Sequence, residues 1–239
     1  MNQLEKLKEI INNSNHIVFF GGSGVSTESN IPDFRSDNGL YKEKKYPYNP
    51  EIMLSRSFFN NHKKEFYDFY LNEMIYLNAT PNKAHLALAK LEQANKLDAI
   101  ITQNIDGLHQ AAGSKNVIEL HGSIKRNYCM KCNSYYNELE IIKYNGNCPK
   151  CNNYIKPDVV LYEESLKEKD LIDAINYIAN CEVLIVGGTS LVVYPAASLI
   201  RYFNGKHLIL INKEKTPYDK YASIVINDSI SKVLDYITK

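Results

Sequence analysis

The 239-residue chain contains no tryptophan and carries almost no net charge. Its 28 basic and 27 acidic residues leave a formal charge of +1, so no overall field draws it to nucleic acid or to an anionic membrane. Asparagine, lysine, isoleucine and tyrosine are abundant, which indicates coding bias and excludes no function. Because 44% of the residues are hydrophobic, we expect a substantial core and no extensive disorder.

Segments typical of secretion or membrane insertion are also lacking. The first residues, MNQLEKLKEIINN, have the pattern of an amphipathic helix without the long apolar region of a signal peptide. The segment Val183–Ile200 has 18 residues without a charge, which is near the lower limit for a membrane span. Gly187, Gly188 and Pro195 interrupt it, so we favour a strand, a turn and a helix. We expect a cytoplasmic protein that does not contact a membrane.

Six short apolar runs predict the strands of a sheet. They are apolar at successive positions, which is typical of parallel strands covered on both faces. Helical patterns lie between them: we expect one helix to begin with Thr80 and Pro81, and another with a capping box of Ser165 and Glu168. The expected strands are His16–Phe20, Asp98–Gln103, Asn116–Leu120, Glu182–Gly187, His207–Asn212 and Ser223–Asn227. This alternation predicts an α/β fold with a doubly wound parallel sheet.

Two segments break the alternation and predict a smaller second domain. One is rich in proline and tyrosine, and the other contains cysteine pairs. We expect residues 1–30, 79–122 and 157–239 to form the larger domain. Residues 31–78 and 123–156 would form the smaller, helical and zinc-binding domain.

Four of the five cysteines form two C-x2-C pairs, Cys129 with Cys132 and Cys148 with Cys151. In a cytosolic chain this spacing predicts a tetrahedral zinc site rather than disulfides or reduced core cysteines. Four cysteine ligands leave no position for water or substrate, so the zinc is expected to be structural. Zinc ribbons can also bind nucleic acid, but glutamates accompany the lysines of this segment, so we do not expect direct nucleic-acid binding.

A glycine-rich loop follows the first expected strand. Gly22 and Gly24 would let the backbone approach a phosphate, but Thr27 stands where a dinucleotide fingerprint has its third glycine. No strand-end acid follows at the distance typical of a dehydrogenase, so the loop by itself is a weak signal. The next residues, Asp33, Phe34 and Arg35, combine an acid, an aromatic ring and a cation that could meet a phosphate.

Taken in order, the motifs resemble those of the sirtuins, a family of NAD-dependent protein lysine deacylases, in its bacterial type. The resemblance covers almost the whole chain: GGSGVS with NIPDFRS, TQNIDGLH, ELHG, both cysteine pairs, KPDVVLYEE, GGTSLVVYPAA and LILIN. It implies a Rossmann-like domain and a zinc-bearing small domain, with NAD and an acyl-lysine peptide between them. The chain departs from the family pattern at Ser23, usually alanine, at Asn30, usually glycine, and at Glu163, often glycine; the last is expected to alter the substrate-side loop.

The resemblance also implies which residues contact the ligands. The peptide would pair with the strand that contains Val159, Val160, Leu161 and Tyr162. NAD would be held by the phosphate loop, a flexible cover, the nicotinamide and ribose pocket, and strand ends near the adenosine. These residues are Gly22, Ser23, Gly24, Thr27, Asp33, Phe34, Arg35, Gln103, Asn104, Ile105, Asp106, His121, Gly188, Thr189, Ser190, Asn212 and Ile230.

His121 is the expected catalytic residue. In the implied reaction the acyl oxygen attacks a ribose carbon and nicotinamide leaves, so positioning can contribute roughly 7–11 kcal/mol. A ribose hydroxyl must then lose a proton, and a nearly neutral imidazole can accept it, with a gain of roughly 10²–10⁴ in rate. Asp106 would hold the nicotinamide carboxamide and Asn104 the ribose or a water, whereas His109 is expected to brace the loop. The products would be nicotinamide, O-acyl-ADP-ribose and free lysine.

Two other functions remain open from the sequence: transfer of ADP-ribose to a protein, and a sensor that only binds NAD or ADP-ribose. A sensor needs no base, so His121 disfavours it. Desuccinylating members carry Tyr-x-x-Arg on a small-domain helix, whereas here Tyr67 is followed by Tyr70 at the arginine position. Burying a carboxylate without a cation is costly, so we expect acetyl and longer apolar acyl groups as substrates, rather than succinyl. Nothing in the pattern demands an oligomer, and a monomer is expected.

Overall fold

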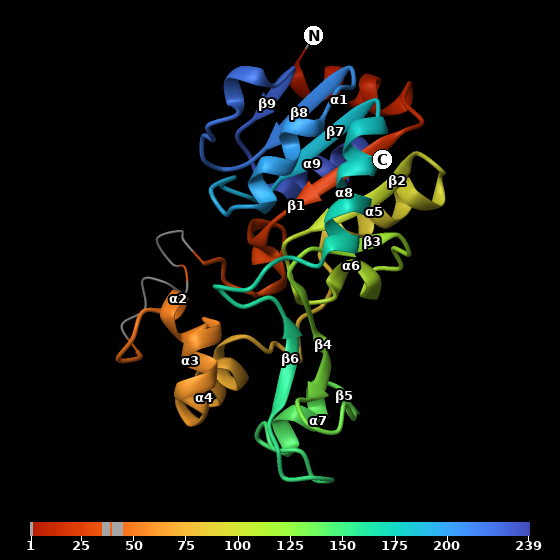
Figure 1. The fold of residues 1–239 in the computed structure, drawn as a ribbon. Helices are drawn as coiled ribbons and strands as arrows, with labels where there is room; N and C mark the ends of the chain where they lie inside the picture. The colour runs from red at the N-terminus through yellow and green to blue at the C-terminus, as the bar shows by residue number, and fades with distance from the viewer. Residues whose placement is uncertain (1, 35–38, 40–44) are drawn as a thin grey trace.

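The computed structural model describes residues 2–34, 39 and 45–239, and its larger part is built on a parallel sheet (Figure 1). All six strands predicted from the apolar runs belong to this sheet, so the predicted fold class is confirmed. They are β1 (Ile17–Gly21), β2 (Leu97–Thr102), β3 (Val117–Glu119), β7 (Val183–Gly187), β8 (His207–Ile211) and β9 (Ile224–Ile226). Their order across the sheet is β3-β2-β1-β7-β8-β9. The chain adds β2 and β3 on one side of β1 and β7, β8 and β9 on the other, so the strand order reverses between β1 and β7. In doubly wound sheets, ligands bind at such a reversal, beyond the carboxyl ends of the strands.

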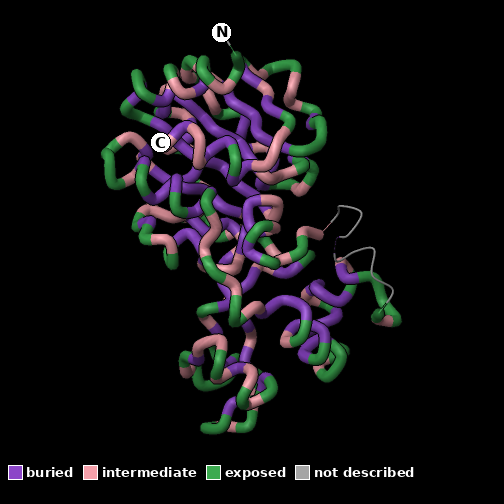
Figure 2. The backbone as a smooth tube through the Cα atoms, turned by 180° about the vertical axis from the view of Figure 1, so that it is seen from behind, coloured by how far each residue is buried: buried purple, intermediate pink, exposed green. Residues whose placement is uncertain are grey.

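Helices cover both faces of this sheet, which explains why its strands are apolar at most successive positions. On one face α1 (Gln3–Asn12), α5 (Lys83–Gln93) and α9 (Ile230–Ile237) pack over Ile17 and Phe19. On the other face α8 (Glu168–Asn180) and the 3-10 helix η4 (Ala196–Tyr202) pack over Val18 and Phe20. Figure 2 shows the buried strands running through this part of the molecule under exposed connections.

Both predicted helix starts are wrong in detail. Helix α5 begins after Asn82, whose side chain accepts a hydrogen bond from the Ala84 amide, while the His85 side chain accepts one from the Asn82 amide. Thr80 therefore lies outside the helix. Helix α8 begins at Glu168 with Lys167 as its N-cap and no side-chain cap, so the expected box is not formed.

The smaller part contains a three-stranded antiparallel sheet and a group of short helices. Its strands are β4 (Gly122–Cys129), β5 (Tyr135–Tyr136) and β6 (Ile155–Val159), in the order β5-β4-β6. Helices α2 (Pro50–Met53), α3 (Arg56–Asn61), α4 (Lys63–Glu73) and α7 (Glu138–Lys143) share a third apolar core with these strands. Strand β6 crosses the expected boundary after residue 156, and the division into domains stays a prediction.

The two sheets are joined closely on the side of β3. That strand ends at Glu119 and β4 begins at Gly122, so only Leu120 and His121 lie between the sheets. In the described part of the chain, no helix combines the length and apolar character that crossing a membrane requires.

Candidate active site

A chain of polar contacts runs across the carboxyl ends of four strands. After β8, the Asn212 Oδ1 accepts a hydrogen bond from the Thr189 amide at 2.9 Å. After β7, the Thr189 hydroxyl accepts one from the Gln103 Nε2 at 3.1 Å. After β2, the Gln103 carbonyl lies 2.9 Å from the Nδ1 of His121, which follows β3. The polar residues predicted at separate strand ends therefore form one continuous edge.

The glycine loop after β1 forms two short 3-10 helices, η1 (Ser23–Val25) and η2 (Thr27–Ser29), rather than a long helix. It is tied to the β7 end by the Gly24 amide, which donates to the Gly188 carbonyl at 2.8 Å. A Cβ at Gly24 would lie 2.8 Å from the Gly188 Cα, so only glycine permits this approach. The Thr27 hydroxyl turns back to the Gly24 carbonyl at 3.1 Å and closes the loop where a third glycine is usual.

Ser26 connects this loop to the predicted nicotinamide pocket, and the sequence analysis missed it. Its hydroxyl donates to the Asp106 carboxylate at 2.7 Å and accepts from the Asn104 Nδ2 at 3.1 Å. The other Asp106 oxygen accepts from the Leu108 amide at 2.9 Å, at the start of α6 (Leu108–Ala111). The position of Ser26 within GGSGVST, beside glycines expected to approach a phosphate, was the available signal.

The His121 imidazole is fixed in one tautomer. A backbone carbonyl can only accept a hydrogen bond, so Nδ1 carries the proton that reaches Gln103, and Nε2 keeps its lone pair. Burial lowers the pKa of His121, and the bond to the Gln103 carbonyl offsets part of this effect. The next residue, Gly122, has φ of +76°, and a Cβ there would lie 1.9 Å from the Asp158 carbonyl oxygen. Only glycine can therefore turn the chain after the imidazole.

His109 lies behind the pocket rather than in it. It is 1% exposed, and its ring packs against Phe19 and His85. Neither ring nitrogen has a hydrogen-bond partner in the part of the chain that the structure describes. Burial, together with neighbouring His85, lowers the pKa of His109 to about 3. This position fits the predicted bracing role and does not fit a base.

The predicted substrate strand lies beside His121, but only its first residue, Val159, belongs to β6; Val160 and Leu161 lie outside any strand, and Tyr162 forms an isolated bridge with Ser55. The Val160 amide donates to the His121 carbonyl at 2.9 Å, and the Tyr162 amide donates to the Leu54 carbonyl at 2.9 Å. Glu163 has φ of +75°, a region that glycine adopts more easily. Its carboxylate accepts hydrogen bonds from the Ser57 amide and hydroxyl, both at 2.8 Å. The departure from the family pattern at position 163 thus attaches this loop to α3.

These residues surround two adjoining cavities of about 260 and 190 Å³. Ser23, Phe34, Thr189 and Ser190 line both. The larger cavity also contacts the nicotinamide-side and peptide-side residues: Gly22, Gln103, Asn104, Ile105, Asp106, His121, Val159, Val160, Leu161 and Tyr162. The smaller contacts the adenosine-side residues: Gly24, Thr27, Asp33, Gly188, Asn212 and Ile230. Every predicted ligand residue that the structure describes thus lines this cleft, whereas Arg35 lies outside the described residues.

The smaller cavity contains a buried donor that a bound ligand could satisfy. The Asn212 Nδ2 is buried and has no hydrogen-bond partner among the described residues, although the Oδ1 of the same amide is satisfied. A buried donor without a partner is costly, so it indicates a ligand acceptor at this point.

The side chains of the larger cavity that sequence analysis missed include Val193 and Tyr194, in the run that follows GGTS.

The four paired cysteines converge at the far end of the three-stranded sheet. The four sulfur atoms all lie within 4.8 Å of one another. Each pair is closed by a left-handed asparagine: the Asn133 amide donates to the Cys129 carbonyl at 3.0 Å, and the Asn152 amide to the Cys148 carbonyl at 2.9 Å. Four thiolates on two matching turns fit a tetrahedral zinc ion with a closed coordination sphere.

The two tyrosines of the expected acyl-recognition position do not reach the cleft. Tyr67 is 3% exposed and donates to the Ile155 carbonyl at 2.7 Å. Tyr70 is fully buried and stacks on Phe66. The assumption that position 70 would face the acyl group is therefore wrong for this chain, and acyl selection has to be argued from the residues that line the cavity.

Comparisons with known proteins agree with this geometry. The model of the Sir2 family matches residues 22–195. The chain is 60% identical to an NAD-dependent protein deacetylase of Clostridium tetani, over 100% of this chain and 98% of that protein. It is 59% identical to the protein of the same name from Clostridium perfringens, over 97% of each chain.

Solved structures with the same fold hold ligands. A Sir2 structure with a p53 peptide and NAD+ is 39% identical, with a TM-score of 0.84, and the match covers 98% of this chain and 96% of that one. Another, Sir2Tm bound to a propionylated peptide, is 37% identical with a TM-score of 0.86 and the same coverage.

Proposed function

The chain belongs to the Sir2 family, and we infer that it is an NAD-dependent protein deacetylase that removes acetyl groups from lysine side chains. The observation that carries this conclusion is the His121 imidazole, which faces the cleft with one nitrogen fixed by the Gln103 carbonyl. Its relatives include enzymes named for this activity and a Sir2 structure with a deacetylated p53 peptide and 3'-O-acetyl-ADP-ribose. The products would be nicotinamide, O-acetyl-ADP-ribose and free lysine.

When bound, NAD supplies a cationic nicotinamide that leaves easily and a ribose that receives the acetyl group. The chain's own residues hold the reactants and move one proton. Asn104 and Asp106, joined through Ser26, would orient the ribose and the carboxamide. The Nε2 of His121 would accept the proton of a ribose hydroxyl, since its Nδ1 is committed to Gln103.

The peptide would lie along Val159–Tyr162, which lines the larger cavity together with His121. The apolar side chains of Ile105, Ile124 and Leu161 line the same cavity and would surround the lysine stem and a short acyl chain. Longer apolar acyl groups are therefore proposed as additional substrates, in line with the propionylated peptide bound by a structural neighbour.

The four cysteines would hold one zinc ion that stabilises the small sheet and takes no part in the chemistry. We also propose a cytoplasmic location, because zinc thiolate sites of free cysteines are typical of reducing compartments. A monomer that does not bind nucleic acid remains our proposal from the sequence.

Incubation of the purified protein with NAD and an acetyl-lysine peptide tests the function. Mass spectrometry should show loss of acetyl from the peptide, and His121→Ala should lose at least about 100-fold in full turnover. His16→Ala is the matched control, since His16 lies exposed at the opposite end of the sheet, beside Asp98. A gain of ADP-ribose on the peptide would indicate transfer of that group, and unchanged turnover in His121→Ala would remove the mechanism.

A further inference from the structure

Backbone hydrogen bonds hold His121 between the two sheets. On the side of the large sheet, the Leu120 amide donates to the Thr102 carbonyl at 3.0 Å. On the side of the small sheet, the His121 carbonyl accepts from the Val160 amide at 2.9 Å. The distance between the imidazole and the substrate strand therefore depends on how the end of β3 is placed against β6.

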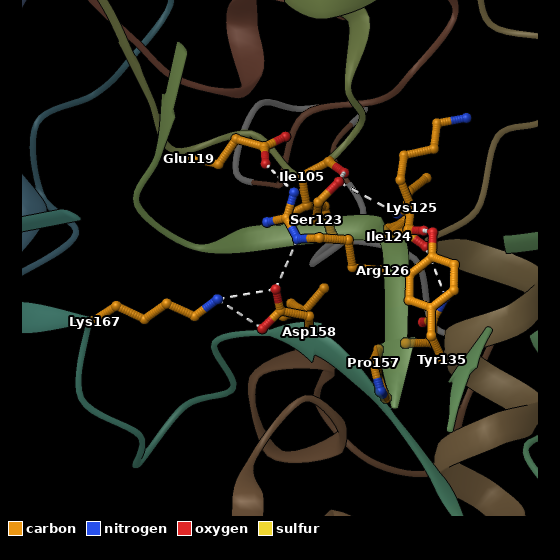
Figure 3. A network of polar contacts seen from close by, with 12 residues as sticks. Ile105, Glu119, Ser123, Ile124, Lys125, Arg126, Tyr135, Pro157, Asp158 and Lys167 are labelled. Atoms are coloured by element: carbon orange, nitrogen blue, oxygen red, sulfur yellow. Dashed lines mark hydrogen bonds and ion pairs between the residues drawn. The ribbon is translucent and has the colours of Figure 1, made fainter. Parts of the chain in front are cut away.

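Arg126 connects the same two strands through side chains, as Figure 3 shows. Its Nη1 lies 2.7 Å from the Glu119 carboxylate at the end of β3, and its Nε lies 2.9 Å from the Asp158 carboxylate on β6. Glu119 is two residues before His121, and Asp158 is two residues before Val160. The backbone of His121 makes one connection between these two segments. The Arg126 guanidinium makes a second, two residues earlier on each segment.

The local backbone aims Arg126 at this position. The pairing of β4 with β6 is regular at Gly122 and Ser123, shifts, and resumes at Asn127. Arg126 lies in the irregular segment, and such bulges redirect the side chains that they carry. Gly122, with its left-handed φ, begins the same strand.

Burial makes this connection more than a surface ion pair. The Glu119 side chain is only 8% exposed, and Arg126 is its one ion-pair partner among the described residues. Burial by itself would lower the pKa of Arg126, but hydrogen bonds to Asp158 and Glu119 raise it above its usual value. Asp158 has a second cation, because Lys167 lies 2.8 Å from it and is half exposed. Loss of Arg126 would leave Glu119 buried and unpaired, whereas loss of Lys167 leaves both carboxylates paired.

We propose that Arg126 is a positioning residue, which holds His121 at its working distance from the substrate strand without touching the substrate. This inference rests on the proposed function, because it gives that strand and that imidazole their roles. A displacement of about 1 Å at a reacting group can cost 10²-fold in rate, so a clamp on both strands can control turnover.

Steady-state kinetics with NAD and an acetyl-lysine peptide test this role in three variants. Arg126→Met should lower kcat by about 10- to 100-fold while the KM for NAD changes much less, because no residue of this cluster is among the described residues that line the adenosine-side cavity. Arg126→Lys should recover part of kcat, since an ammonium group reaches one carboxylate but not both. Lys167→Met is the matched control, and it should keep the parental kcat.

A spectroscopic measurement separates positioning from activity. The His121 ring gives a ¹H–¹⁵N signal that can be assigned by its loss in His121→Ala. This signal should move in Arg126→Met and stay in place in Lys167→Met. If Arg126→Met keeps both the parental kcat and the parental His121 signal, the inference is overturned.

Should Arg126→Met fail to fold, the double variant Glu119→Gln with Arg126→Met removes both charges and leaves none buried without a partner. The same loss of kcat is expected there, and a parental kcat would overturn the inference. A parent protein without deacetylase activity would remove the proposed function instead, and the NMR comparison would still decide whether Arg126 places His121.

Discussion

The carbonyl oxygen of Gln103 lies 2.9 Å from the Nδ1 of His121, and this one contact joins the ends of β2 and β3. It settles which nitrogen of the imidazole can accept a proton. It also leaves the Gln103 side chain free to reach Thr189, so that one residue connects the proposed base to the adenosine side of the cleft.

The pH dependence of activity follows from the environment of His121. Burial lowers its pKa below the usual 6.5, and the Gln103 carbonyl offsets only part of that shift. A base works when it is neutral, so kcat/KM should be constant at neutral pH and fall only as the pH drops through the lowered value. The midpoint of the acid limb should therefore lie below 6.5. Initial rates at NAD and peptide concentrations below their KM values, with circular dichroism at each pH, would measure it; a midpoint above that value contradicts the assignment.

Stability should depend on pH through the buried histidines. Burial lowers the pKa of His109 to about 3 and also lowers that of His85. Because the folded values lie below the unfolded one, this contribution is complete above about pH 6.5 and is lost as the pH falls toward the folded values. Each histidine should add a slope of about 1.4 kcal/mol per pH unit in that window. Urea unfolding at two pH values gives the change in the free energy of unfolding per pH unit. This change should be smaller for His109→Leu than for the parent, and equal changes would refute the argument.

Zinc should stabilise the small sheet. Cys151→Ser removes one of four ligands, so the zinc content should fall from one per chain, and the free energy of unfolding should fall by several kcal/mol. Metal analysis and thermal unfolding would measure both. Cys181→Ser is the control, because Cys181 is buried between Ile178 and β7, away from the cluster, and should retain full zinc. Full zinc in Cys151→Ser would contradict a four-cysteine site.

Acyl selectivity should follow from the charges in the larger cavity. Its described lining contains no lysine or arginine, whereas Glu73, Glu163 and Glu164 lie along it. A succinyl carboxylate would be desolvated there without a cation, so its kcat/KM should be at least about 100-fold below that of acetyl on the same peptide. Competition assays with matched peptides would measure the ratio. Tyr70→Arg should destabilise the protein rather than confer desuccinylation, since Tyr70 is fully buried.

The sequence predicted the strands of the large sheet well because these strands, buried on both faces, need uninterrupted apolar runs. It predicted the cysteine cluster because zinc ligands require a fixed spacing. The start of α5 was wrong because Thr80 and Asn82 are both good caps, and only the tertiary fold selects Asn82, which also donates to the Val25 carbonyl. Tyr70 was misplaced because a motif specifies the position along a helix and not the direction in which the helix turns that face.

Contacts between distant segments were beyond the reach of sequence patterns. Ser26 meets Asp106, and Arg126 meets Glu119 and Asp158, only after both sheets have formed. No local rule distinguishes a serine in a glycine loop, or an arginine that follows a lysine in a strand, from an ordinary surface residue. Glu163 gave a weak signal, because an unusual residue at a family glycine position draws attention, yet its partner Ser57 lies far away in the chain.

Gly122 sets a limit on how this enzyme can be redesigned. Directed evolution that randomises the residues around His121 should recover glycine at position 122 in every active clone, since any larger residue collides with the Asp158 backbone. Positions 119 and 126 should instead covary, as complementary pairs of charge and size. The backbone turn after His121 therefore admits only glycine. The placement of His121 can be varied only by exchanging the residues at positions 119 and 126 together.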